Sequence, residues 1–155
     1  MLYTLLLSLH SLFRWLVLIS LLYAIYCGAK GWSGKVAFSK TDNTIRHLTA
    51  TIAHIQLAIG YTLYFYSPLI TYFRENYRQA SKQFELLFFG VIHVLLMTTA
   101  IVIITIGSAM AKRKERDTLK FRTMAVFYII ALFIIFISIP WPFSPFANRP
   151  YLRPF

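Results

Sequence analysis

The chain has 155 residues and a net charge of +11, and 58% of its residues are hydrophobic and 17% aromatic. Its mean hydropathy of +0.62 is too high for a soluble domain and is typical of a small membrane protein. The single cysteine excludes an internal disulfide or a thiolate metal site within one chain.

Four apolar stretches are long enough to cross about 30 Å of hydrocarbon as helices. They cover residues 2–29, 44–68, 86–111 and 123–143. Lipid admits only helices or closed barrels, and each stretch is too long and unbroken for a strand. The sequence therefore predicts an all-α fold, a single domain built as a polytopic membrane four-helix bundle.

Local signals predict where the second helix begins and ends and what the two loops after it do. Asp42 or Asn43 is the expected N-cap of the second helix, and Pro68 is expected to end it. The segment 69–85 mixes aromatic and basic residues, which suits a short stretch lying in the outer membrane interface. The next loop is short and charged, so the third and fourth helices are predicted to be antiparallel neighbours.

The fourth helix is predicted to end at Pro140 and Pro142, with Trp141 at the level of the lipid head groups. The Pro-rich tail, residues 144–155, follows it. It is expected to be extended or bound to a partner, since its prolines prevent a regular helix.

Basic residues predict the orientation of the bundle. Those of the first and third loops are numerous: Lys30, Lys35, Lys40 and Arg46, and then Lys112, Arg113, Lys114, Arg116, Lys120 and Arg122. The second loop and the tail carry fewer basic residues: Arg74, Arg78, Lys82, Arg149 and Arg153. Positive loops stay in the cytoplasm, so both termini are expected on the outer, periplasmic side. The same clusters suit anionic lipid head groups, and this distribution argues against nucleic acid as a partner.

The chain's histidines are the strongest functional signal. His10, His54 and His93 lie inside the apolar stretches, and His47 lies at the edge of one. Ionisable side chains are costly in hydrocarbon, so they normally face a bundle interior, pair, or bind a ligand. In the predicted topology, His10 and His93 each lie roughly 12 Å below the outer end of a helix, and His54 lies about 10 Å deeper.

Two imidazoles at one depth on different helices are what a bis-histidine haem b requires. His10 and His93 are therefore candidate ligands of the haem iron, and His54 can replace either one if the helices tilt. Gly90 lies three residues before His93, where a missing side chain would admit a porphyrin ring. No nucleophile–base pair, phosphate loop or carboxylate pair is present, so an independent catalytic site is not predicted.

Arg14 lies one turn below His10 on the same helix face. All acidic residues of the chain lie in loops or at helix ends, so none is an obvious partner for a buried guanidinium. A haem propionate, a quinone oxygen or a lipid phosphate would supply the missing acceptor. Alternatively, Arg14 snorkels to the outer head groups.

Other interpretations stay open. The histidines can be ordinary interhelical hydrogen-bonding residues of an accessory subunit in a larger membrane complex or homo-oligomer. The tail, with its exposed aromatic residues up to Phe155, would then be a docking element. Three converging imidazoles can also hold copper or zinc, with Met97 as the one soft neighbour. A proton-coupled carrier that uses His54 is less attractive, because the spans contain no carboxylates.

Several motifs spread over nearly the whole chain resemble those of a known family. They are His10-Ser11-Leu12-Phe13-Arg14-Trp15, Ala53-His54-Ile55-Gln56 with Gly60, Tyr64-Phe65-Tyr66-Ser67-Pro68, His93 with Met97, Ile104-Thr105-Ile106-Gly107 and Ile139-Pro140-Trp141-Pro142-Phe143. As a set they resemble short four-span bacterial inner-membrane proteins labelled cytochrome b or b-type cytochrome-like. The resemblance implies a membrane haem protein that passes electrons, with His10, His54 and His93 as candidate ligands. Members tend to carry an acid directly before the third-span histidine, where this chain has Ile92.

Overall fold

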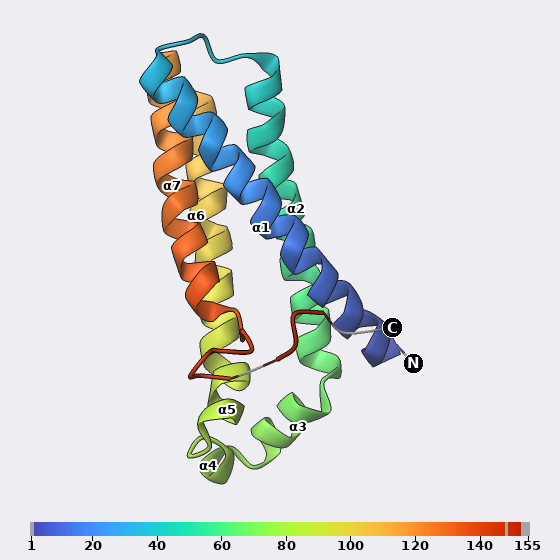
Figure 1. Cartoon of the computed structure of the whole chain (residues 1–155). Coiled ribbons are helices and arrows are strands. Elements are labelled where there is room, and N and C mark those ends of the chain that lie inside the picture. Colours follow the sequence, from blue (N-terminus) through green and yellow to red (C-terminus); the bar gives the residue numbers. More distant parts are fainter. Residues whose placement is uncertain (1, 148, 153–155) are drawn as a thin grey trace.

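The computed structural model describes residues 2–147 and 149–152, and within them the chain is helical and contains no strand (Figure 1). The long helices are α1 (Leu2–Gly34), α2 (Lys40–Tyr66), α6 (His93–Arg113) and α7 (Asp117–Ser138). The short ones are α3 (Pro68–Glu75), α4 (Tyr77–Ala80) and α5 (Phe84–Leu87). A π-helical turn, η1 (Phe88–Ile92), joins α5 to α6 in one continuous helical segment.

Three helical segments in the described residues are long and apolar enough to cross a membrane: Leu2–Gly34, Phe84–Arg113 and Asp117–Ser138. This confirms an all-helical membrane protein. The helix α2 has 27 residues, but its first half carries Lys40, Arg46 and His47 among several threonines, which lowers its hydropathy. The crossing predicted for residues 44–68 therefore stays a prediction.

The helix ends follow from capping and proline. Ser39, and neither Asp42 nor Asn43, caps α2, so that prediction was wrong by about one turn. The Ser39 hydroxyl accepts from the Asp42 backbone N–H at 3.1 Å, and the Asp42 carboxylate accepts from the Ser39 N–H at 2.9 Å. Pro68 occupies the first turn of α3, so α2 ends at Tyr66 as expected, and α7 ends at Ser138, two residues before Pro140.

The helices α6 and α7 lie side by side and run antiparallel, as predicted, while α1 crosses α2 and packs along α7 (Figure 1). Small residues permit these close approaches, as they commonly do between membrane helices. A Cβ atom added at Gly31 of α1 would lie 2.4 Å from the ring of Phe121 in α7. One added at Gly107 of α6 would lie 2.2 Å from the Cβ of Phe127 in α7.

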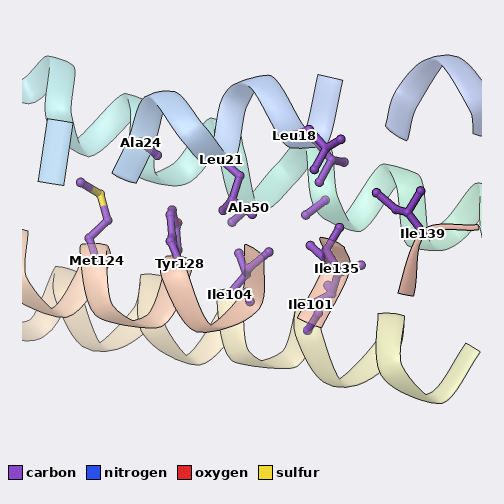
Figure 2. Packing of buried hydrophobic residues seen from close by; sticks show 14 of the residues in the cluster. Leu18, Leu21, Ala24, Ala50, Ile101, Ile104, Met124, Tyr128, Ile135 and Ile139 are labelled. Carbon is purple, nitrogen blue, oxygen red and sulfur yellow. The ribbon is translucent and has the colours of Figure 1, made fainter. Parts of the chain in front are cut away.

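The core lies between all four long helices (Figure 2). Its members include Leu18, Leu21 and Ala24 of α1, Ala50 of α2, Ile101 and Ile104 of α6, and Met124, Tyr128 and Ile135 of α7. A polar cluster lies among these apolar residues. The Tyr128 hydroxyl donates to the Arg46 carbonyl at 2.7 Å, and the buried Arg46 guanidinium donates to the Ser108 carbonyl at 3.0 Å. These bonds connect α2, α6 and α7.

The tail folds back onto the bundle at the end opposite the α1–α2 connection (Figure 1). The Arg149 N–H donates to the Pro140 carbonyl at 3.1 Å, and its guanidinium pairs with Glu85. The Trp15 indole donates to the Tyr151 carbonyl at 3.1 Å. The described part of the tail contains no helix or strand, and these contacts connect it to α1 and α5, so its binding to a partner stays a prediction. Residues 148 and 153–155, including the predicted docking residue Phe155, lie outside the described residues.

Candidate functional site

Two of the predicted site residues lie side by side. The imidazole of His10, from α1, and that of His93, the first residue of α6, have ring centroids 6.4 Å apart and planes inclined by 67°. Both residues are partly buried. The two rings thus lie at one level on different helices, as the depth argument from the sequence predicts.

The carbonyl of Ser138 fixes the tautomer of His93. His93 Nδ1 lies 2.9 Å from this carbonyl oxygen, which only accepts, so Nδ1 carries the proton. Ser138 is the last residue of α7, and the residue four positions later is Pro142, which has no N–H to bond this carbonyl. In a neutral imidazole, Nε2 is then the bare acceptor. This nitrogen has no hydrogen-bond partner among the described residues.

The π-helical turn η1 directly precedes His93 and is supported by α2. The Tyr64 hydroxyl donates to the Gly90 carbonyl at 2.9 Å, and the backbone N–H of His93 closes the wide turn on the Phe88 carbonyl. Single π-turns inside longer helices are frequent at functional sites. Here the turn sets the direction in which α6 presents His93.

The surroundings of His10 come mainly from α2. The Gln56 side-chain amide donates to the His10 carbonyl at 3.0 Å and lies 3.4 Å from its Nε2. The Nδ1 atom of His10 is buried and has no hydrogen-bond partner within the described residues. Gly60, one turn after Gln56, makes room for the ring, because a Cβ there would lie 3.2 Å from His10 Cε1. His10 therefore has an unsatisfied ring nitrogen beside a position where any side chain would crowd the ring.

Both imidazoles line one cavity of about 300 Å³ between α1, α2, α6, the end of α7 and the tail. Its wall is mainly apolar, and the residues that bring polar groups to it include His10, His93, Arg14, Gln56, Tyr61, Tyr64 and Arg149. Small-molecule and cofactor sites range over about 300–1,000 Å³ and combine apolar walls with a few convergent polar groups. The cavity lies at the lower end of that range.

Two guanidinium groups lie at this cavity. Arg14 donates to the Tyr151 carbonyl, and its Cζ lies 5.7 Å from the Trp15 ring centroid and 6.0 Å from that of Trp141. Arg149 pairs with Glu85. Arg14 was expected either to meet a propionate, a quinone oxygen or a lipid phosphate, or to snorkel to the outer head groups. In this structure its guanidinium donates to the Tyr151 carbonyl of the tail and to the Ser11 hydroxyl at 3.5 Å.

The remaining predicted residues lie elsewhere. His54 is exposed on α2, and its Nε2 lies 3.0 Å from the Thr105 hydroxyl. Gly90 does not line the cavity, since a Cβ there would lie 2.6 Å from the Phe73 ring. In the described ranges, no group of three or more His, Cys, Asp or Glu side chains is placed to hold a metal ion. The alternative of three converging histidines around copper or zinc is therefore wrong for that part of the chain.

Sequence reasoning gave no role to several residues that shape this site. Gln56 and Gly60 are four residues apart, so they share a face of α2, and both lie against His10. That spacing was visible in the sequence. The sequence also showed that the Ser138 carbonyl would lack a helical hydrogen bond, because Pro142, four positions later, has no N–H. Arg149 reaches the cavity through tertiary contacts of the tail, for which the sequence carries no local signal.

No protein-family model, curated protein or solved structure matches this chain. The resemblance to b-type cytochrome-like proteins thus gains no independent support from relatives. Any assignment of function depends on the histidine pair, its cavity and the charges around it.

Proposed function

We propose that this chain is a haem b-binding electron-transfer protein of a bacterial inner membrane, in which His10 and His93 would hold the haem iron. The spacing of the two imidazoles carries the proposal. Metal–imidazole bonds are about 2 Å long, so one ion between two rings needs their facing nitrogens roughly 4 Å apart. Ring centroids 6.4 Å apart suit that spacing, and four-helix bundles build such sites from facing helices.

The ring nitrogens also fit a metal-bound group. A histidine that ligates a metal through one nitrogen usually donates its other N–H to a carbonyl or carboxylate, which orients the ring and raises its basicity. The Ser138 carbonyl has this relation to His93. On the other side, His10 Nδ1 has no hydrogen-bond partner among the described residues, and its ring packs against Gly60. Bound haem would supply reversible one-electron chemistry.

The charges at the cavity support an anionic cofactor. Arg14 and Arg149 both line it, and guanidinium groups are well suited to carboxylates such as the haem propionates. Arg149 already pairs with one carboxylate, that of Glu85. Arg14 would exchange the Tyr151 carbonyl for a stronger, charged acceptor. Neither residue would then carry an uncompensated charge beside the apolar wall.

We include α2 as a fourth membrane crossing, with both termini on the outer side. This helix lies beside α1 and α6 and is comparable to them in length. The basic connections α1–α2 and α6–α7 lie together at one end, which the positive-inside rule assigns to the cytoplasm. The cavity lies toward the other end. Electron exchange with quinone or a partner redox protein is therefore proposed to occur near the outer face.

The absorption spectrum of the purified protein tests this function. Protein expressed with an ample haem supply should show a Soret band, and an α band after reduction. His10→Ala and His93→Ala should each lose most of the bound haem. His54→Ala is the matched control, because His54 lies in the same bundle but outside the cavity. A colourless wild-type protein, or equal haem loss in all three variants, would contradict the proposal.

An accessory subunit without haem is the second candidate. Its support is that His93 already makes an interhelical hydrogen bond of an ordinary structural kind. In addition, Phe143, just before the tail, and Phe146 within it keep 66% and 45% of their surface exposed to a partner. Co-purification of a stoichiometric partner with a colourless chain would favour this function. One purification therefore distinguishes the two candidates, by the colour of the chain and by the presence of a stoichiometric partner.

A further inference from the structure

A second hollow lies at the opposite, basic end of the bundle. Its volume is about 490 Å³, and it lies between the α1–α2 connection, the start of α2, the end of α6 and the start of α7. We call it the lysine pocket, and its lining is Phe38, Ser39, Lys40, Asn43, Thr44, Lys112 and Lys120. Three of these residues are lysines that come from three different helices.

Two acidic residues beside the lysine pocket, Asp42 and Asp117, already have partners. Asp117 pairs with Lys120 at 2.7 Å, and Asp42 caps α2 through Ser39. Lys40 and Lys112 make no ion pair among the described residues. Among the described residues, the pocket therefore keeps two lysine ammonium groups without an ion-pair partner.

The neutral side chain of Asn43 adds a hydrogen-bond donor to the pocket. The side-chain oxygen of Asn43 accepts from the buried Arg46, with Nη2 at 2.9 Å and Nε at 3.3 Å. This orients the amide, so that its NH2 group is the remaining polar atom. That NH2 group has no acceptor in the part of the chain that the structure describes. Arg46 is in turn held by Ser108, so the orientation of Asn43 is fixed from the core.

We propose that the lysine pocket binds the phosphate group of an anionic ligand. Ammonium groups and amide N–H groups are donors that suit phosphate oxygens, and lysine is a common phosphate ligand. Basic pockets between membrane helices on the cytoplasmic side bind anionic lipid head groups. The shared chemistry is a phosphate, whether it belongs to a lipid or is free in solution. This inference does not depend on haem.

Thermal unfolding of the full chain in a neutral detergent tests the lysine pocket. Phosphatidylglycerol, phosphatidylcholine and inorganic phosphate are titrated separately. The test variant is Lys40→Gln/Lys112→Gln. The control, Lys30→Gln/Lys114→Gln, removes the same charge from the same basic end of the bundle but outside the pocket. A Lys40→Arg/Lys112→Arg variant keeps the charge and shows whether the site tolerates substitution.

The wild type, the control and the arginine variant should all be stabilised by phosphatidylglycerol. The apparent affinity of the glutamine test variant should be about tenfold lower or worse, since contacts to charged groups are lost. If inorganic phosphate gives the same pattern, the ligand is free phosphate, and if it does not, the ligand is a lipid. Equal responses of the test variant and the control, equal stabilisation by phosphatidylcholine, or no response at all, would overturn the proposal.

Discussion

His93 Nδ1 donates to the Ser138 carbonyl at 2.9 Å, which connects the start of α6 to the end of α7. The bond exists because the chain cannot continue α7 through its prolines, so a carbonyl is left without a backbone donor. Its consequence is chemical, since it leaves Nε2 of His93 as the bare nitrogen in a residue that lines the cavity.

Gly60→Val should abolish haem binding while the protein stays folded. Even a single Cβ at this position lies 3.2 Å from His10 Cε1, so a branched side chain must displace the imidazole. Replacing a helical glycine also gains roughly 0.5 kcal/mol of helix propensity, which offsets part of the strain. Haem content and thermal unfolding measure the two effects separately. Ala58→Val, at an exposed position of the same helix, is the control and should keep its haem.

Arg14→Gln should lower the reduction potential of the bound haem. A guanidinium beside the iron favours the reduced, less positive state, and its loss removes about 1 kcal/mol, which is roughly 40 mV for a one-electron couple. A redox titration followed at the α band measures the shift. Arg113→Gln, at the basic end of α6, should leave the potential unchanged. An unchanged or raised potential in Arg14→Gln would place this charge away from the iron.

Gly31→Ala should loosen the contact between α1 and α7. The added Cβ would lie 2.4 Å from the Phe121 ring, which is fully buried and has little room to move. Overpacking of this kind typically costs about 1–3 kcal/mol of unfolding free energy. Denaturant unfolding in detergent measures it. Gly34→Ala serves as the control, because its nearest neighbour would be Val36 at 3.7 Å.

Tyr128→Phe should destabilise the bundle without changing its spectrum. The substitution removes the 2.7 Å bond from the buried Tyr128 hydroxyl to the Arg46 carbonyl, which contributes about 1 kcal/mol. Thermal unfolding and the haem spectrum are recorded on the same sample. Tyr26→Phe, at an exposed position, should change neither. A spectral change in Tyr128→Phe would mean that the core and the cavity are coupled more closely than the contacts indicate.

The parts of the fold that depend on local chemistry were predictable. Prolines located the ends of α2 and α7, and equal distance from the helix ends placed His10 and His93 at one level. The cap of α2 was visible too, because Ser39 and Asp42 have the spacing of a capping box. These predictions succeeded, or were within reach, because each depends on residues a few positions apart.

Other features depend on tertiary structure. The three-residue spacing of Gly90 and His93 suggests one helix face, but the wide π-helical turn rotates Gly90 onto Phe73. His54 was expected inside the bundle. The face of α2 that packs against the bundle consists instead of small and polar residues: Arg46, Thr49, Ala50 and Ala53. His54 lies off this face and is exposed. Apolar pattern alone does not reveal such a face.

Electron paramagnetic resonance of the oxidised, haem-loaded protein tests the central claim most directly. Two imidazole ligands should give a low-spin ferric signal in the wild type and in His54→Ala. His10→Ala and His93→Ala should each convert the remaining haem to high spin, because each removes one axial ligand. A low-spin signal that persists in both of these variants would contradict the ligation of one iron by His10 and His93.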